Sequence, residues 1–153
     1  MTYQLVRVES AEQWRAMHSI RRSVLFESGI MPFIYDENRP EDRHPDNIPY
    51  LLLLDSSPIG VVRLDKDGRT GIVRLVGIAL DRQRQGHGRA LGKLIEEEAV
   101  RAGIVELRLN AHEGAIGFYE KTGWAEHTWD VDELSHLAPG DIQMTKKIRQ
   151  NGS

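Results

Sequence analysis

The segment from Ile78 to Leu91 has the composition of a phosphate-binding loop. It reads IALDRQRQGHGRAL, so two glycines and three arginines lie between an apolar run and a helical pattern of apolar residues. Backbone N–H groups at a helix start have no partner within the helix, and the helix dipole adds about half a positive charge there. Glycine lacks a Cβ atom, which lets an anion approach these groups. The pattern predicts a phosphate site, with Arg82, Arg84 and Arg89 as nearby positive charges.

Three phosphate-binding patterns compete for this segment. A Walker loop requires Gly-x4-Gly-Lys-Ser/Thr, but no glycine pair here has that spacing and Lys93 is followed by Leu94. A dinucleotide fingerprint requires Gly-x-Gly-x-x-Gly; Gly86 and Gly88 fit its first two positions, but Leu91 occupies the third. The third pattern is Gln/Arg-x-x-Gly-x-Gly/Ala. A glycine-rich turn without a ligand also stays open on these residues alone.

A second motif further along the chain favours the third pattern. Gln85, Gly88 and Ala90 fill Gln-x-x-Gly-x-Ala, and the stretch 118–124 reads FYEKTGW. In this order, the two stretches resemble the acetyl-CoA loop and the Phe-Tyr-x-Lys-x-Gly-Phe signature of GNAT superfamily N-acetyltransferases. The N-terminal half is similar to a smaller branch that includes ElaA-like proteins, through the stretches 24–30, 50–53 and 58–64.

The resemblance implies an acyltransferase that uses acetyl-CoA, releases coenzyme A and needs no metal. In this family the pantetheine arm lies between two splayed strands and pairs with backbone, which here means Ile78 and Leu80. The diphosphate is expected on the backbone amides from Gln85 to Ala90. The residues implied as coenzyme contacts are Ile78, Ala79, Leu80, Arg84, Gln85, Gly86, His87, Gly88, Arg89, Ala90, Asn110, His112 and Tyr119.

The same resemblance assigns catalytic roles to two side chains. Tyr119 is implied as the general acid toward the departing thiolate, because a phenol keeps its proton at neutral pH. Glu27 is the leading candidate for the general base, since the segment after the first helix is expected to line the acceptor side. Some family members carry a glutamate on the strand before the loop, but no Asp or Glu occurs from Gly68 through Leu80. The other candidate bases are His44, His112, Glu113 and His136. An amine that is already neutral needs no side-chain base.

The order of the predicted elements indicates an α/β (α+β) fold, which we expect to position both motifs. Apolar runs and turn signals predict strands over 2–8, 50–54, 59–64, 72–80, 104–109, 124–129 and 142–148. Helices are predicted after Ser10, whose capping box includes Gln13, and over 88–102 and 114–122. A strand–helix–strand crossover makes 72–80 and 104–109 parallel neighbours.

The resemblance completes this expected architecture. It implies a GNAT-like mixed central sheet of about six or seven strands, an antiparallel N-terminal meander, and about three or four flanking helices. The parallel pair 72–80 and 104–109 is expected to splay apart. The residues 31–49, which include four prolines, form a long irregular segment that we expect near the acceptor.

Composition limits the partners. The 153 residues include 20 Lys and Arg against 23 Asp and Glu, a net charge of −3. This balance gives no global attraction to nucleic acid or to an anionic membrane. The sequence has no cysteine, which excludes disulfides and thiolate metal sites. With neither a secretory signal nor a membrane-spanning run in sight, we expect a soluble, cytoplasmic protein.

The remaining expectations concern organisation and function class. We expect one N-acetyltransferase domain over 1–148 and a frayed tail over 149–153. The acceptor is expected to be a primary amine of a small molecule or a protein, and a homodimer is common in the family. A non-catalytic acetyl-CoA sensor on the same fold and a nucleotide-binding domain of another type are the alternatives.

Overall fold

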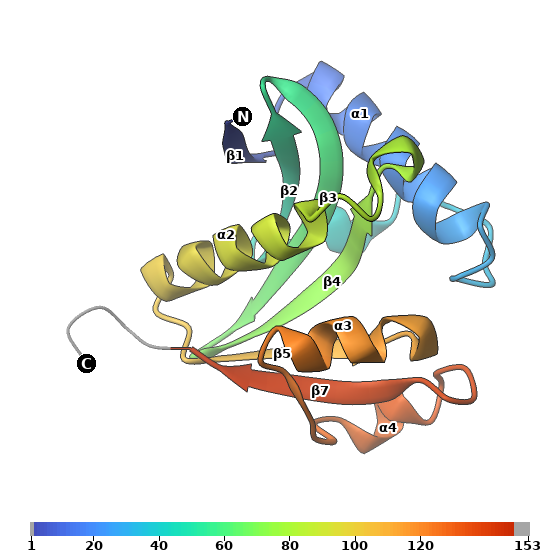
Figure 1. The fold of residues 1–153 in the computed structure, drawn as a ribbon, viewed down its shortest axis with the longest axis vertical. Helices are drawn as coiled ribbons and strands as arrows, with labels where there is room; N and C mark the ends of the chain where they lie inside the picture. The colour runs from blue at the N-terminus through green and yellow to red at the C-terminus, as the bar shows by residue number, and fades with distance from the viewer. Residues whose placement is uncertain (1, 149–153) are drawn as a thin grey trace.

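A seven-stranded mixed sheet forms the centre of the described part of the chain (Figure 1). The computed structural model describes residues 2–148. The strand order is β1-β2-β3-β4-β5-β7-β6, and only β4 and β5 pair in parallel among the described strands. The strands are β1 (Tyr3–Arg7), β2 (Asn47–Leu54), β3 (Ser57–Asp67), β4 (Thr70–Ile78), β5 (Glu106–Ala111), β6 (Ala125–Glu126) and β7 (Ile142–Lys147). The helices are α1 (Ala11–Arg21), α2 (His87–Arg101), α3 (Ile116–Lys121) and α4 (Val131–Leu134). The expected mixed α/β fold is confirmed.

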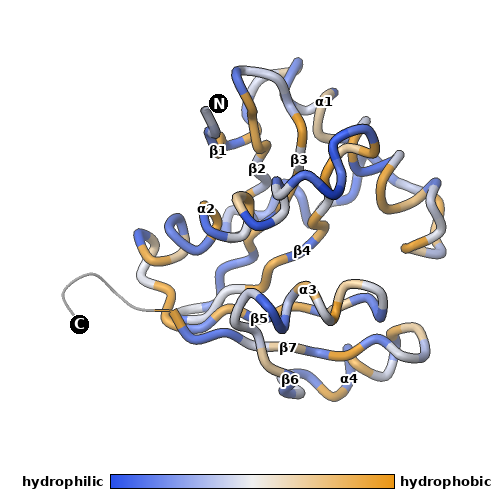
Figure 2. Tube along the Cα trace, viewed as in Figure 1, coloured by the Kyte–Doolittle hydropathy of each residue, from blue (hydrophilic) through white to orange (hydrophobic). Residues whose placement is uncertain are grey.

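Helices cover both faces of this sheet. Leu91 and Ile95 of α2 belong to one buried cluster on the sheet, together with the partly buried Tyr119 of α3. Met17 and Ile20 of α1 belong to a second buried cluster on the opposite face. Figure 2 shows hydrophobic stretches in β2, β3 and β4 and a mostly hydrophilic loop after β4. Burial of these apolar stripes provides the main favourable term for folding.

The N-terminal helix begins as its sequence predicts. Ser10 accepts a hydrogen bond from the Gln13 backbone N–H, and Gln13 reciprocates toward the Ser10 backbone, which completes the capping box. The helix continues into a π-helical turn, Arg22–Phe26, which packs on β4: a Cβ atom on Gly77 would lie 3.1 Å from Val24 Cγ1. This contact brings the segment after α1 to the outer end of β4.

An ion cluster fixes the proline-rich segment. Asp42 lies in a 3-10 turn, Pro40–Arg43, with a side chain that is 1% exposed. It accepts hydrogen bonds from Arg21 Nη1 at 2.8 Å and from Arg63 Nη1 at 2.9 Å. The segment predicted to be irregular is therefore tied to α1 and β3.

The meander from β2 to β4 contains a bulge that the sequence did not predict. Its β3–β4 register shifts between Val61 and Arg63, and Leu75 on β4 has a φ of 54°. Val73 and Val76 pack in the cluster under α2, whereas Leu75 packs in the cluster under α1. A bulky residue with positive φ is an outlier, and such strain gathers at functional sites.

Several predicted boundaries were wrong. The strand predicted over 72–80 spans 70–78, and Leu80 lies in a 3-10 turn beyond it. The strand predicted over 104–109 spans 106–111, so it includes Asn110. The closing strand predicted over 124–129 shrinks to Ala125–Glu126, and the short helix α4 that follows was not predicted. The tail predicted over 149–153 lies outside the described residues. Within residues 2–148, every helix is too short or too polar to cross a bilayer.

Candidate active site

The two parallel strands separate soon after they pair. The pairing of β4 with β5 joins Thr70–Ile72 to Glu106–Arg108 only, although β4 continues to Ile78 and β5 to Ala111. The predicted splay is therefore confirmed. Because the strands diverge, the β4 edge from 73 to 78 has no partner on β5.

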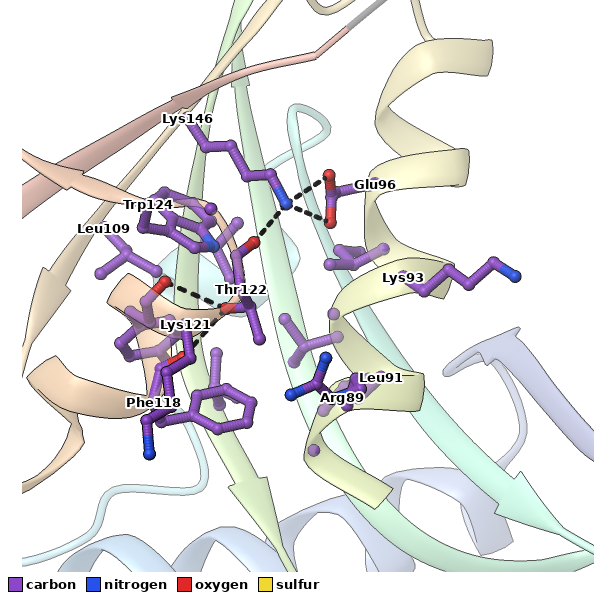
Figure 3. A pocket seen from close by; sticks show the side chains of 18 residues that line it. Arg89, Leu91, Lys93, Glu96, Leu109, Phe118, Lys121, Thr122, Trp124 and Lys146 are labelled. Atoms are coloured by element: carbon purple, nitrogen blue, oxygen red, sulfur yellow. Dashed lines mark hydrogen bonds and ion pairs between the residues drawn. The ribbon is translucent and has the colours of Figure 1, made fainter. Parts of the chain in front are cut away.

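A cavity of about 480 Å³ lies over this opening, between α2 and α3 (Figure 3). Apolar side chains from the sheet and the helices line most of it, and cations lie along it. The lining residues are Val62, Val73, Val76, Gly88, Arg89, Leu91, Gly92, Lys93, Ile95, Glu96, Leu109, Phe118, Tyr119, Lys121, Thr122, Gly123, Trp124 and Lys146. An apolar cleft with a few polar groups is typical of a ligand site.

A lysine spans the cavity between the helix α2 and the turn after α3. Lys146 Nζ donates to Thr122 O at 2.6 Å and contacts Glu96 Oε1 at 3.0 Å (Figure 3). Near the start of α2, a Cβ atom on Gly88 would lie 3.4 Å from Phe118 Cζ. Gly88 therefore keeps this passage between the two helices open.

The loop before α2 presents unpaired backbone N–H groups. The helix begins at His87 with Gly86 as its N-cap at φ 87°, and Ala90 N donates to Gly86 O at 3.4 Å. Helix geometry leaves the N–H groups of His87, Gly88 and Arg89 without intrahelical acceptors. Arg84 also has a left-handed φ, 63°. Left-handed and right-handed residues in succession form concave anion-binding backbone.

A residue that the sequence analysis missed, Gln83, supports this loop. Its Nε2 donates to Ile78 O at 3.0 Å, which ties the loop to the end of β4. The spacing Gln83-x-x-Gly86-x-Gly88 fits the same pattern as the spacing that begins at Gln85. The earlier copy places its glycines at the N-cap and in the first turn of α2. This duplicate spacing was the signal that would have revealed Gln83.

The edge strand β1 also holds the loop, through Tyr3. Its hydroxyl lies 2.7 Å from His87 Nδ1, and His87 Nε2 lies 3.3 Å from Gln85 Oε1. Since the Gln85 oxygen only accepts, His87 Nε2 donates to it and Nδ1 accepts from Tyr3. His87 is 4% exposed. Nothing in the sequence pattern links Tyr3 to a residue 84 positions away.

Tyr119 lines the cavity, as its predicted role requires. Its ring makes edge contacts with Phe118 and Trp124, at centroid distances of 5.4 and 5.9 Å. Burial raises the pKa of Tyr119 to about 12. Among the described residues, none forms a hydrogen bond with its hydroxyl group, which leaves this proton donor free for a ligand.

The residues predicted at the end of β4 occupy different environments. Ile78 is the last residue of the strand, and its carbonyl group accepts from Gln83. The Ala79 N–H donates to Ile59 O at 2.7 Å. Leu80 is 59% exposed in its turn. The cavity lining contains Gly88, Arg89 and Tyr119 from the predicted site but none of these three.

The other predicted residues lie outside the cavity lining. Asn110 on β5 donates to Glu133 and accepts from Gln143. His112 is exposed and caps a short 3-10 turn by accepting from the Gly114 N–H at 3.2 Å. Glu27 is exposed at the end of the π-helical turn.

Comparison with known proteins decides the family. The profile described as the acetyltransferase (GNAT) family matches residues 13–124. The chain belongs to the GNAT family. This membership confirms the family resemblance that the two motifs indicated, and as a GNAT protein the chain is an acyltransferase.

Individual GNAT relatives agree in sequence and in fold. A Bacillus subtilis (strain 168) protein named as an acetyltransferase is 24% identical over 133 residues, covering 86% of this chain and 90% of its own. The ribosomal-protein-S18-alanine N-acetyltransferase of Escherichia coli superposes with a TM-score of 0.77 at 19% identity, covering 99% of this chain and 97% of its own. Escherichia coli ElaA superposes with a TM-score of 0.77 at 17% identity, covering 95% of this chain and 98% of its own. The PaiA N-acetyltransferase of Thermoplasma acidophilum, solved with coenzyme A, superposes with a TM-score of 0.74 at 17% identity, covering 96% of this chain and 99% of its own.

Proposed function

We propose that this GNAT protein transfers an acetyl group from acetyl-CoA to a primary amine by direct attack in a ternary complex. The observation that carries the proposal is the cavity between α2 and α3, which lies over the splayed strands β4 and β5 and begins at the open start of α2. An elongated ligand with an anionic part and an apolar arm fits this combination of charge and shape.

The first turn of α2 and the loop before it would bind the diphosphate of the coenzyme. The N–H groups from Arg84 to Arg89 include those that the helix leaves unpaired, whereas Ala90 N already donates to Gly86 O. Arg89 also adds a positive charge beside the cavity. The unpaired backbone of β4 would accept the pantetheine arm as an added strand, up to Ile78. The coenzyme A complex of the Thermoplasma acidophilum relative supports this ligand.

Tyr119 would act as the general acid. Its raised pKa, about 12, keeps the hydroxyl protonated at neutral pH, so it can give its proton to a thiolate. A backbone N–H of β4 near Ile78 would stabilise the oxyanion. Holding the amine beside the acyl group in one cleft contributes about 7–11 kcal/mol through proximity.

The acceptor would be an amine of a small molecule or of a protein. A relative of this fold is named for acetylating the alanine of a ribosomal protein, and another is an aminoglycoside N-acetyltransferase. Both classes place a primary amine at the acyl carbon. We further propose a cytoplasmic location and a homodimer, which cell fractionation and sedimentation would test.

Thermal denaturation with candidate ligands tests the proposal. Acetyl-CoA should raise the melting temperature, because a ligand that binds only the folded state stabilises it, whereas NAD and ATP should not. Stabilisation by NAD or ATP but not by acetyl-CoA would contradict the proposal in favour of another nucleotide-binding domain. Binding without thiol release over a broad panel of amines would favour a sensor of acetyl-CoA.

A further inference from the structure

A carboxylate bridges the two diverging strands. Glu133 on α4 accepts from Arg74 Nη2 at 2.9 Å through Oε1 and from Asn110 Nδ2 at 3.2 Å through Oε2. Arg74 belongs to β4 and Asn110 to β5, each two positions beyond the last pair of the strands, Ile72 with Arg108. The carboxylate therefore spans the opening where the strands begin to separate.

This carboxylate lies across the sheet from the cavity. Val73 and Leu109, each one position beyond the last strand pair, line the cavity under α2 and α3. Successive side chains of a strand point to opposite faces, so Arg74 and Asn110 point to the other face. Glu133 is thus separated from the cavity floor by the thickness of the sheet at its opening.

A set of hydrogen bonds fixes Glu133 in this position. The Asp130 side chain caps α4 by accepting from the Glu133 N–H at 3.0 Å. Gln143, which is 1% exposed, accepts from the N–H groups of Trp129 and Asp130, both at 2.9 Å. Its Nε2 donates to Asn110 Oδ1 at 3.1 Å, which orients Asn110 toward Glu133. A functional group held by such a supporting shell is preorganised.

Glu133 keeps capacity for a ligand. An ionised carboxylate offers about four lone-pair sites, and Arg74 and Asn110 use two of them. The side chain is 29% exposed. An amine that reaches the opening from this face can therefore donate a hydrogen bond to Glu133 without displacing its partners.

We propose that Glu133 is the acceptor-side catalytic residue, whose carboxylate binds the attacking amine and takes its proton. The inference rests on the proposed function, because the coenzyme would fill the cavity face and leave the opposite face to the amine. The amine lone pair forms the C–N bond with the acyl carbon, and the C–S bond breaks with its electron pair on sulfur. Sulfur takes the proton of the Tyr119 hydroxyl, Glu133 takes the N–H proton, and solvent returns both side chains to their starting states.

Matched glutamine variants test this role. Glu106 is the control residue, because it lies on the face of β5 that carries Asn110 and forms an ion pair with Arg108 at 2.9 Å, with 23% of its side chain exposed. Unlike Glu133, it lies where β4 and β5 are still paired. The assay is thiol release from acetyl-CoA with spermidine, ethanolamine, Nα-acetyl-lysine methylamide and a peptide with a free N-terminal alanine. Calorimetry with coenzyme A and the melting temperature are measured for every variant.

Glu133→Gln should lower kcat for the best amine by about 100-fold or more, with the affinity for coenzyme A within twofold of the wild type. Glu133→Asp should recover part of the rate, and Glu106→Gln should stay within threefold. A kcat of Glu133→Gln within threefold of the wild type, or an equal loss in Glu106→Gln, would overturn the inference. So would a loss of rate that follows a loss of stability and coenzyme affinity.

Two results separate this inference from the proposed function. If the protein binds coenzyme A but releases no thiol above the buffer rate with any of the four amines, the catalytic role of Glu133 is overturned while the coenzyme site stands. If coenzyme A does not bind at all, the proposed function fails first, and the inference fails with it.

Discussion

Replacing Gly88 with alanine should stabilise the protein and weaken coenzyme binding, two effects of opposite sign. Gly88 is the second residue of α2 and lies in its first turn, so the preference for alanine over glycine in a helix interior, about 1 kcal/mol, is an upper bound for this position. The new Cβ atom would lie 3.4 Å from Phe118 Cζ, an ordinary contact that causes no strain. We expect stability to rise by up to about 1 kcal/mol, which corresponds to about 2–4 °C in melting temperature for a protein of this size.

The same methyl group narrows the passage that the coenzyme needs. It projects toward Phe118, where α2 approaches α3 at the cavity. Overpacking a filled site with an added methyl group costs about 1–3 kcal/mol, and this cost would fall on the complex, in which the coenzyme fills the passage. At 1.4 kcal/mol per factor of ten, this cost raises the Kd of coenzyme A by about 5- to 150-fold.

Calorimetry with coenzyme A and thermal denaturation would measure both effects. Gly117→Ala is the matched control, because Gly117 is also helical and is absent from the cavity lining. A Cβ atom on Gly117 would meet no described residue outside its own helix within 4 Å. This variant should gain stability without a change in Kd. An unchanged Kd in Gly88→Ala would refute the placement of the coenzyme beside Gly88. A lower melting temperature would refute the expectation that alanine stabilises the start of α2 more than glycine does.

Three further changes have defined outcomes. Tyr119→Phe should lower kcat by about 100-fold or more at unchanged coenzyme affinity; because the pKa of Tyr119 is raised to about 12, wild-type turnover should not fall between pH 8 and 10, and a decline there would argue against this acid. Tyr3→Phe removes the hydrogen bond to His87 and should raise the Kd of coenzyme A by about 2- to 10-fold, whereas an unchanged Kd would mean that β1 does not hold the loop. Burial raises the pKa of Asp42, but hydrogen bonds and charges from Arg21 and Arg63 outweigh it and lower that pKa below its ordinary value. Its stabilising contribution is therefore present above about pH 4 and is lost as pH falls through the lowered pKa. Asp42→Asn should lower the free energy of unfolding by about 3–5 kcal/mol at neutral pH, and in urea denaturation the variant should lose less of this free energy than the wild type as the pH is lowered. An equal loss at acid pH in both proteins would contradict this.

Local patterns in the sequence predicted the parts of the site that depend on neighbours along the chain. The glycine loop and the start of α2 follow from short-range spacing, because helix starts and turns are set by residues a few positions apart. Tyr119 was predicted only through the resemblance of residues 118–124 to the GNAT signature. The capping box at Ser10 and Gln13 is of the same kind, and it formed as predicted.

Contacts between distant segments were beyond such reasoning. The bulge at Leu75 places a bulky residue at positive φ, where the sequence gives no glycine as a signal. The bridge by Glu133 depends on α4, whose four residues are too few for a hydrophobic period. Tyr3 reaches the loop because the sheet order brings β1 near α2, which no local pattern encodes.

The placement of a diphosphate on the backbone between Arg84 and Arg89 is the claim on which the coenzyme site depends. Amide chemical shifts recorded by NMR during a titration with coenzyme A test it most directly. We predict that the largest changes fall on the N–H groups of residues 84–89, and that pantetheine, which lacks the diphosphate, does not reproduce them. Shift changes that avoid this loop, or that pantetheine reproduces in full, would contradict the account.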